Sequence, residues 1–237
     1  MKSQLYLDKF TRQRMIAQLR GIETLYFEKI EPTFAEPQKE AELYTKQLEI
    51  EVSSGIDWGS DDAPSPEPYQ EAVYEAGLAR YELLVTMQYR TLGLWISCIS
   101  QVWEQQLYTW ILHNAQAEGI VYDDKDVKLG FQFVSEILDF HIVDYKLVQS
   151  GKIEEMRELV NTIKHGEGRS EVALRAKRPD LFASGGYDPM KVHRSTLLEP
   201  VLNISSQDFR DYLNALIEFW DTFPERAYSK QDIPVAP

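Results

Sequence analysis

Three polar side chains on one predicted helix could carry out acid–base or phosphate chemistry. Arg157, Asn161 and His165 follow one another at steps of four residues. On a helix, this spacing forms a slanting row in which neighbouring side chains can touch. An imidazole exchanges protons near neutral pH, an amide one turn earlier can orient its ring, and a guanidinium fork suits phosphate. The row therefore indicates either phosphodiester cleavage without a metal or simple anion binding.

The end of this helix also has a purely structural interpretation. Lys164 and His165 fall in its last turn, where cations complement the negative end of the helix dipole. Gly166 and Gly168 follow, and glycine just beyond the last turn is a common helix stop. Spacing alone favours this structural interpretation.

Basic residues continue downstream of His165. The densest basic run of the chain is RSEVALRAKR at 169–178. Its first residue, Arg169, and Lys164 before it are the nearest candidates to contact a phosphate group beside the histidine. A solvated helix surface explains such a run equally well.

The segment VNTIKHG at 160–166 resembles the signature of HEPN domains, an all-α family rich in bacterial toxins and antiviral ribonucleases. That signature has an Arg-Asn pair, then a few residues, then His, often with Gly after it. Asn161, His165 and Gly166 match the signature. Val160 stands where the signature has its arginine.

The resemblance implies an all-α helical bundle that forms a homodimer and cuts RNA, or acts on nucleotide phosphates, without a metal. In that interpretation His165 moves the proton, Asn161 orients it, and Arg157 takes the place of the missing arginine. Lys164 and Arg169 would contact phosphate. A second function stays open: a non-catalytic interaction or regulatory protein, such as the partner subunit of a toxin or defence system, that keeps the fold without the chemistry.

Two other patterns could hold a metal ion. His141 and Asp144 have i, i+3 spacing but no third ligand, so packing is the simpler role. Two pairs of carboxylates with the same spacing are typical of MazG-like nucleotide pyrophosphohydrolases, although here they lie far apart in the chain: Glu155 with Glu158, and Glu218 with Asp221. We therefore predict no metal and no other cofactor.

The composition argues against several classes of protein. With 43% hydrophobic and 27% charged residues, the chain of 237 residues should fold around a sizeable core. A net charge of −13 argues against a broad nucleic-acid-binding surface, because such surfaces use clustered Lys and Arg. We expect no membrane partner, since no apolar run is long enough for a bilayer and no signal peptide is visible. Cys98 is the only cysteine, which favours a cytoplasmic location without disulfides.

Apolar periodicity predicts an all-α fold with one dominant helix. Residues 69–117 keep a helical spacing of apolar side chains and contain no proline, so they form one very long helix or two helices joined near Gly93. Glu104 interrupts the apolar half of this helix. It could pair with Arg157 or His165 across the bundle, or it could face solvent.

Shorter helices are predicted on both sides of this long helix, including residues 5–30, 37–52, 127–140 and 170–178. Ser205 and Asp208 form a capping-box pattern at the start of the last helix, and Asp126 could cap the helix that begins at Val127. Residues 53–68 are rich in Ser, Gly, Asp and Pro, which predicts a linker. The predicted organisation is N-terminal helices at 1–52, a linker at 53–68, a helical-bundle core at 69–226 and a tail at 227–237.

Overall fold

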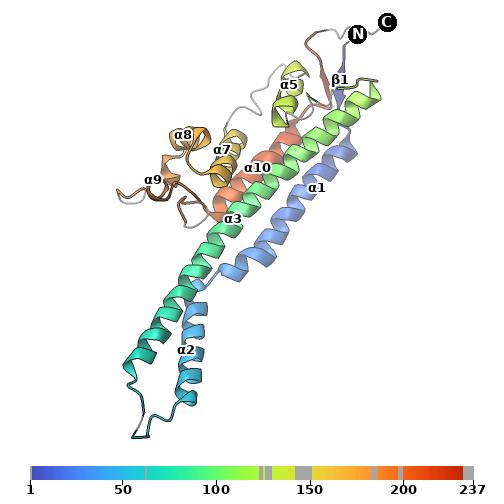
Figure 1. Ribbon diagram of the computed structural model, residues 1–237. Coiled ribbons are helices and arrows are strands. Elements are labelled where there is room, and N and C mark those ends of the chain that lie inside the picture. Colours follow the sequence, from blue (N-terminus) through green and yellow to red (C-terminus); the bar gives the residue numbers. More distant parts are fainter. Residues whose placement is uncertain are drawn as a thin grey trace. The chain divides into compact units, whose positions relative to one another are not determined.

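The computed structural model describes residues 2–61, 63–122, 125, 130–141, 151–182, 186–196 and 200–231. The architecture is all-α, as predicted (Figure 1). Its longer helices are α1 (Lys9–Leu25), α2 (Pro37–Gly55), α3 (Glu67–Ala117), α5 (Phe131–His141), α7 (Lys152–His165) and α10 (Ser206–Thr222). Shorter helical segments are η1 (Tyr26–Ile30), η2 (Glu31–Phe34), α8 (Arg169–Lys177), η3 (Pro179–Leu181) and α9 (Pro189–His193). The predicted cap Asp126 and helix start Val127 lie outside the described residues.

Helix α3 is the very long helix that the sequence predicts, and it continues without a break for 51 residues. Gly93, the candidate break, lies inside it. A Cβ at this glycine would meet the Ile163 side chain of α7 at 3.4 Å, so the small residue allows two helices to approach closely. Within the described part of the chain, neither α3 nor any other helix has the length and apolar character needed to cross a bilayer.

The N-terminal helix starts later than the sequence predicts. Residues 4–6 form a short strand, β1 (Gln4–Tyr6), which pairs in antiparallel register with β2 (Arg226–Tyr228). Asp8 then caps α1, because its side chain accepts hydrogen bonds from the backbone N–H groups of Phe10 and Thr11. A hydrogen bond with the Thr11 hydroxyl has the largest effect on the pKa of Asp8 and lowers it. The two backbone hydrogen bonds lower this pKa further. Strand pairing with residues more than 200 positions away cannot be read from local periodicity.

Contacts along the chain define two compact units. The first unit contains Met1–Thr24 and Leu92–Pro237, and the second contains Leu25–Thr91. Helix α3 contributes its first part to the second unit and its remainder to the first. The predicted linker at 53–68 lies within the second unit, but its first three residues form the end of α2 and its last two form the start of α3.

Aromatic side chains form the core of the first unit, where α1 and α10 lie along α3 (Figure 1). Trp103 of α3 meets Phe219 of α10 edge to face at 5.2 Å between ring centroids. Trp110 makes the same kind of contact with Phe223 at 5.0 Å. Buried Gln106 of α3 accepts a hydrogen bond from the Trp220 indole at 2.8 Å and donates to the Met15 carbonyl of α1. This amide therefore joins three helices without leaving its polar atoms unpaired.

Both ends of α10 are capped. The capping box of Ser205 and Asp208 that the sequence predicts is present at its start. At the other end, the Arg12 guanidinium of α1 donates to the carbonyls of Trp220, Asp221 and Phe223 at 2.6–2.7 Å. A cation at this position satisfies carbonyls that lack a partner in the helix and complements the helix dipole.

A buried polar cluster connects α5 to the N-terminal strand. The Ser3 hydroxyl donates to Glu118 at 2.5 Å and lies 3.1 Å from Nε2 of buried His141. Nδ1 of His141 lies 2.8 Å from the Ile137 carbonyl. Burial lowers the pKa of His141, although the Ile137 carbonyl and the Glu118 carboxylate act in the opposite direction.

This cluster makes the stability of the protein depend on pH. Because the pKa of His141 is lower in the folded state, the unfolded chain takes up the proton first as the pH falls. Stability should therefore be complete above about pH 6.5 and decrease below it. In urea titrations at about pH 7.5 and about pH 5.5, His141→Gln should lose less stability between the two values than the wild type. The exposed His113→Gln variant is the control, and equal losses in His141→Gln and wild type would contradict the assignment.

Candidate functional site

Helix α7 carries the predicted row of polar residues along one edge. Arg157 and Asn161 are half-buried, and His165, the last residue of the helix, is exposed. The row therefore runs from the core toward solvent. Val160, at the position where the HEPN signature has arginine, is only 3% exposed and belongs to the core. A guanidinium at this position would be buried among apolar groups.

The Arg157 side chain is engaged inside the protein. Its Nε donates to Oε1 of Glu104 at 3.2 Å, and its guanidinium carbon lies 3.4 Å from the centre of the Phe131 ring. The arginine thus connects α7 to α3 through an ion pair and to α5 through a cation–π contact. The sequence left open whether Glu104 pairs with Arg157, pairs with His165 or faces solvent. In the structure it pairs with Arg157.

The other predicted site residues point to solvent or to the helix surface. Lys164, His165 and Arg169 are exposed, and Asn161 is half-buried. Within the described ranges, none of these four side chains has a hydrogen bond or an ion pair. They could bind an anion, but the structure brings them together only as neighbours around the end of α7.

Gly166 is explained by backbone geometry. It is buried and has a φ of 71°, a left-handed conformation that favours glycine. A Cβ here would lie 2.5 Å from the Arg194 carbonyl oxygen and 3.3 Å from Cα of Ser195. The Thr196 hydroxyl then donates to the Ile163 carbonyl at 2.5 Å. The glycine therefore ends α7 and lets the segment after α9 pack against that end.

Most of the basic run at 169–178 forms internal ion pairs. Arg175 binds Glu171 and Asp188, and Lys177 binds Glu154 at 2.7 Å. The run is therefore largely neutralised, and Arg169 is the residue of the run without an ion pair among the described residues.

Arg178 is the centre of the most extensive charged cluster. Its guanidinium donates to Glu155 at 2.7 Å, to Asp208 at 2.9 Å and to Asp180. These hydrogen bonds, the one to Asp180 first, raise the pKa of Arg178, and the same contact lowers the pKa of Asp180. Tyr212 donates to Glu155 at 2.9 Å, and burial raises the pKa of this tyrosine. The cluster holds α7, α8 and α10 together.

The metal-site alternatives gain no support. Glu155, a member of one predicted carboxylate pair, is balanced by Arg178 and Lys152. Among the residues that the structure covers, no group of three or more His, Cys, Asp or Glu could hold a metal ion. His141 has a packing role, as the sequence favours, and Asp144 lies outside the described residues.

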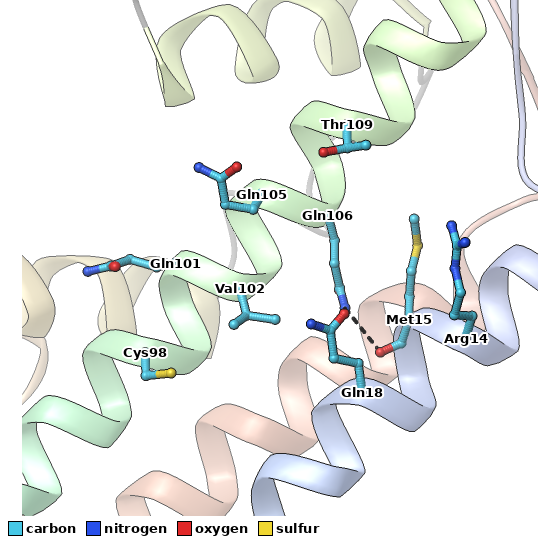
Figure 2. A pocket seen from close by; sticks show the side chains of 9 residues that line it. All are labelled: Arg14, Met15, Gln18, Cys98, Gln101, Val102, Gln105, Gln106 and Thr109. Carbon is cyan, nitrogen blue, oxygen red and sulfur yellow. Dashed lines mark hydrogen bonds between the residues drawn. The ribbon is translucent and has the colours of Figure 1, made fainter.

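A groove between α1 and α3 is a site that sequence reasoning missed. It has a volume of about 460 Å³ and is lined mainly by neutral polar side chains (Figure 2). Helix α1 contributes Arg14, Met15 and Gln18, and α3 contributes residues from Cys98 to Thr109. Gln101, Gln105 and Thr109 follow at steps of four in the α3 sequence, and this polar stripe could have revealed the groove. Cys98 is half-buried at its edge.

A second groove of about 760 Å³ continues from the first and shares Arg14, Met15 and Thr109 with it. Several of its charged groups already have partners: Glu118 accepts from Ser3 and Gln4, and Arg226 stacks over Tyr6. Exposed Arg14 and His113 remain able to bind a polar or anionic group. Amide and hydroxyl side chains do not transfer protons readily at neutral pH, so the first groove is suited to binding.

The second unit leaves more of its large apolar residues exposed than buried. Its helix α2 packs against residues 67–91 of α3, with Gly77 directly against Thr45 and Arg80 paired with Glu40. Among its described residues, only four apolar ones are buried: Tyr26, Ala41, Val73 and Leu84. Eleven large ones are exposed: Leu25, Leu43, Tyr44, Ile50, Trp58, Tyr69, Tyr74, Leu78, Tyr81, Leu83 and Met87. Three of them, Tyr74, Leu78 and Tyr81, line one groove, and apolar side chains grouped at a surface are typical of a binding site.

The chain matches no protein-family model, no curated protein and no solved structure. The candidate sites therefore depend on the geometry and chemistry of the chain itself.

The structural role of Gly166 can be tested against Gly168. Gly166→Ala should destabilise the protein by at least about 2 kcal/mol, because alanine disfavours the left-handed backbone and its Cβ collides with the Arg194 carbonyl. Gly168 has an extended backbone and no atom within 4 Å of an added Cβ, so Gly168→Ala should cost less than about 1 kcal/mol. Urea denaturation measures both, and similar losses would show that the close contact is unimportant.

Proposed function

We propose that this protein is a non-catalytic interaction or regulatory protein, and that its second unit binds a partner. One observation carries the proposal: within the part of the second unit that the structure describes, eleven large apolar side chains are exposed and only four apolar residues are buried. A large apolar side chain contributes about 1.5–3 kcal/mol when it becomes fully buried. A partner that covers several of these side chains would therefore be bound with useful affinity.

The environment of α7 supports the absence of catalysis. Arg157 is held by Glu104 and Phe131, and Gly166 is required by the packing around the end of the helix. The basic run downstream is mostly paired within the protein. Of the residues predicted to contact phosphate or the reacting groups, Arg157 is therefore already engaged within the protein. A cytoplasmic location is part of the proposal, since a single cysteine suits a reducing compartment.

A second candidate function is that of a HEPN-like endoribonuclease, such as a toxin or defence component, that acts as a homodimer on RNA or nucleotide phosphates. The observation in its favour is the set of exposed or half-buried groups that remain without partners among the described residues: Asn161, Lys164, His165 and Arg169. These groups could meet their counterparts in a second copy.

An RNA cleavage assay separates the two functions. Under the non-catalytic proposal, wild type and His165→Ala should show the same background cleavage of single-stranded RNA, because no step uses the imidazole. Lys191→Ala, another exposed residue of the first unit, controls for loss of general charge. Cleavage by wild type that falls at least about a hundredfold in His165→Ala but not in Lys191→Ala would establish the nuclease instead.

Photo-crosslinking tests the binding surface directly. A benzophenone amino acid at position 78 should give discrete crosslinked products in cells that naturally produce the protein. Leu78 is exposed and lines a groove between α2 and α3 of the second unit. Position 83 is a matched control, because Leu83 lies on the same helix and is 51% exposed, compared with 47% for Leu78. No products at position 78 would contradict the proposal, whereas products at position 78 and none at position 83 would assign the binding to the groove side of α3.

A further inference from the structure

The second unit contains a groove between α2 and α3 with a volume of about 560 Å³. Tyr74, Leu78 and Tyr81 of α3 form its apolar wall. At its floor, Gly77 lies directly against the side chain of Thr45, so the two helices are too close for a larger side chain to fill the space between them. The apolar wall therefore stays open to solvent.

The apolar residues of this wall have the spacing of a helix-pairing surface. Tyr74, Leu78, Tyr81 and Val85 are separated by four, three and four residues. This alternation keeps the side chains on one face of a helix and is the spacing by which coiled-coil helices interdigitate. The first three are exposed and Val85 is half-buried. The matching occupant is another helix with the same repeat.

Charged residues border this apolar stripe on both sides. On the α2 side the groove is lined by Glu42, Lys46 and Glu49. On the other side, three exposed glutamates of α3 lie next to the stripe on the helical surface: Glu71, Glu75 and Glu82. Five of these six residues are acidic, so the rim favours a partner with basic residues beside its apolar ones.

The charge of the whole second unit agrees with that of the rim. Leu25–Thr91 contains fourteen acidic and five basic residues, a net charge of −9 out of −13 for the chain. Arg80 does not offset the rim, because it is paired with Glu40 and lies over the Tyr44 ring. Pairing of two copies through this stripe would place glutamate against glutamate, which disfavours a second copy as occupant.

From these observations we infer that the α2–α3 groove of the second unit binds an amphipathic helix of a partner protein, with apolar residues at heptad spacing flanked by Lys or Arg. The inference rests on the proposed function and specifies its partner. The apolar positions of that helix cover Tyr74, Leu78 and Tyr81, and its cations lie beside the glutamates of the rim.

The experiment uses the full chain and a synthetic three-heptad helical peptide with Leu at positions a and d and Lys at e and g. A control peptide has Glu in place of Lys. Fluorescence anisotropy should show the Lys peptide binding at least about tenfold more tightly than the Glu peptide, and its affinity should weaken as salt is added.

Protein variants locate the binding on the groove. Leu78→Ser should weaken binding of the Lys peptide by about tenfold, whereas the equally exposed Leu83→Ser should change it by less than about threefold. Glu75→Gln with Glu82→Gln should weaken it by about two- to tenfold and reduce its salt dependence. Glu28→Gln with Glu51→Gln, which removes the same charge away from the stripe, should leave it unchanged.

Equal binding of the two peptides, or equal effects of the Leu78 and Leu83 variants, would overturn the inference. Crosslinks at position 78 that join two copies, in a dimer that Leu78→Ser dissociates, would also overturn it. Those results would leave the proposed interaction function standing. The absence of any crosslinked product at position 78 would instead remove the proposed function itself.

Discussion

Burial of the aromatic rings between α3 and α10 is the interaction on which the first unit depends. Trp103 and Trp220 are fully buried, Phe219 of α10 contacts Trp103 of α3, and Phe223 at the end of α10 contacts Trp110 of α3. Large aromatic side chains contribute more buried surface than any other kind, so these contacts decide which side of α3 faces inward. Once that side is set, Gln106 must find partners inside the core, and it does so on α1 and α10.

The orientation of α3 then decides which groups the residues of α7 contact. Glu104 is placed where it meets Arg157, and Gly93 is placed where α7 approaches closely. Residues whose types suggest chemistry therefore carry out structural work: an ion pair, a helix end and a charged cluster around Arg178. The groups left uncommitted around the end of α7 are exposed or half-buried.

In the second unit, by contrast, most large apolar side chains are not covered by another helix. Two packed helices can bury only the side chains between them, and the close contact of Gly77 with Thr45 leaves little space there. The remaining apolar side chains stay at the surface, bordered by glutamates. The high net negative charge of this unit opposes association of two copies through such a surface, because like charges repel. In the proposed function, the apolar stripe and its acidic rim are two parts of one binding surface.

The sequence by itself determined the features that depend on neighbours within one or two turns. These include the helical class, the helical character of residues 69–117, the capping box of Ser205 and Asp208, and the glycine that ends α7. That residues 69–117 form one helix and not two was left open by the sequence and is shown by the structure. It also predicted the row from Arg157 to His165, but not what surrounds that row. Only the tertiary structure decided that Arg157 meets Glu104, that residues 4–6 pair with β2, and that Leu84 is buried while Leu78 is exposed. Local spacing fixes which residues share a helix face, whereas burial and charge pairing depend on which distant segment covers that face.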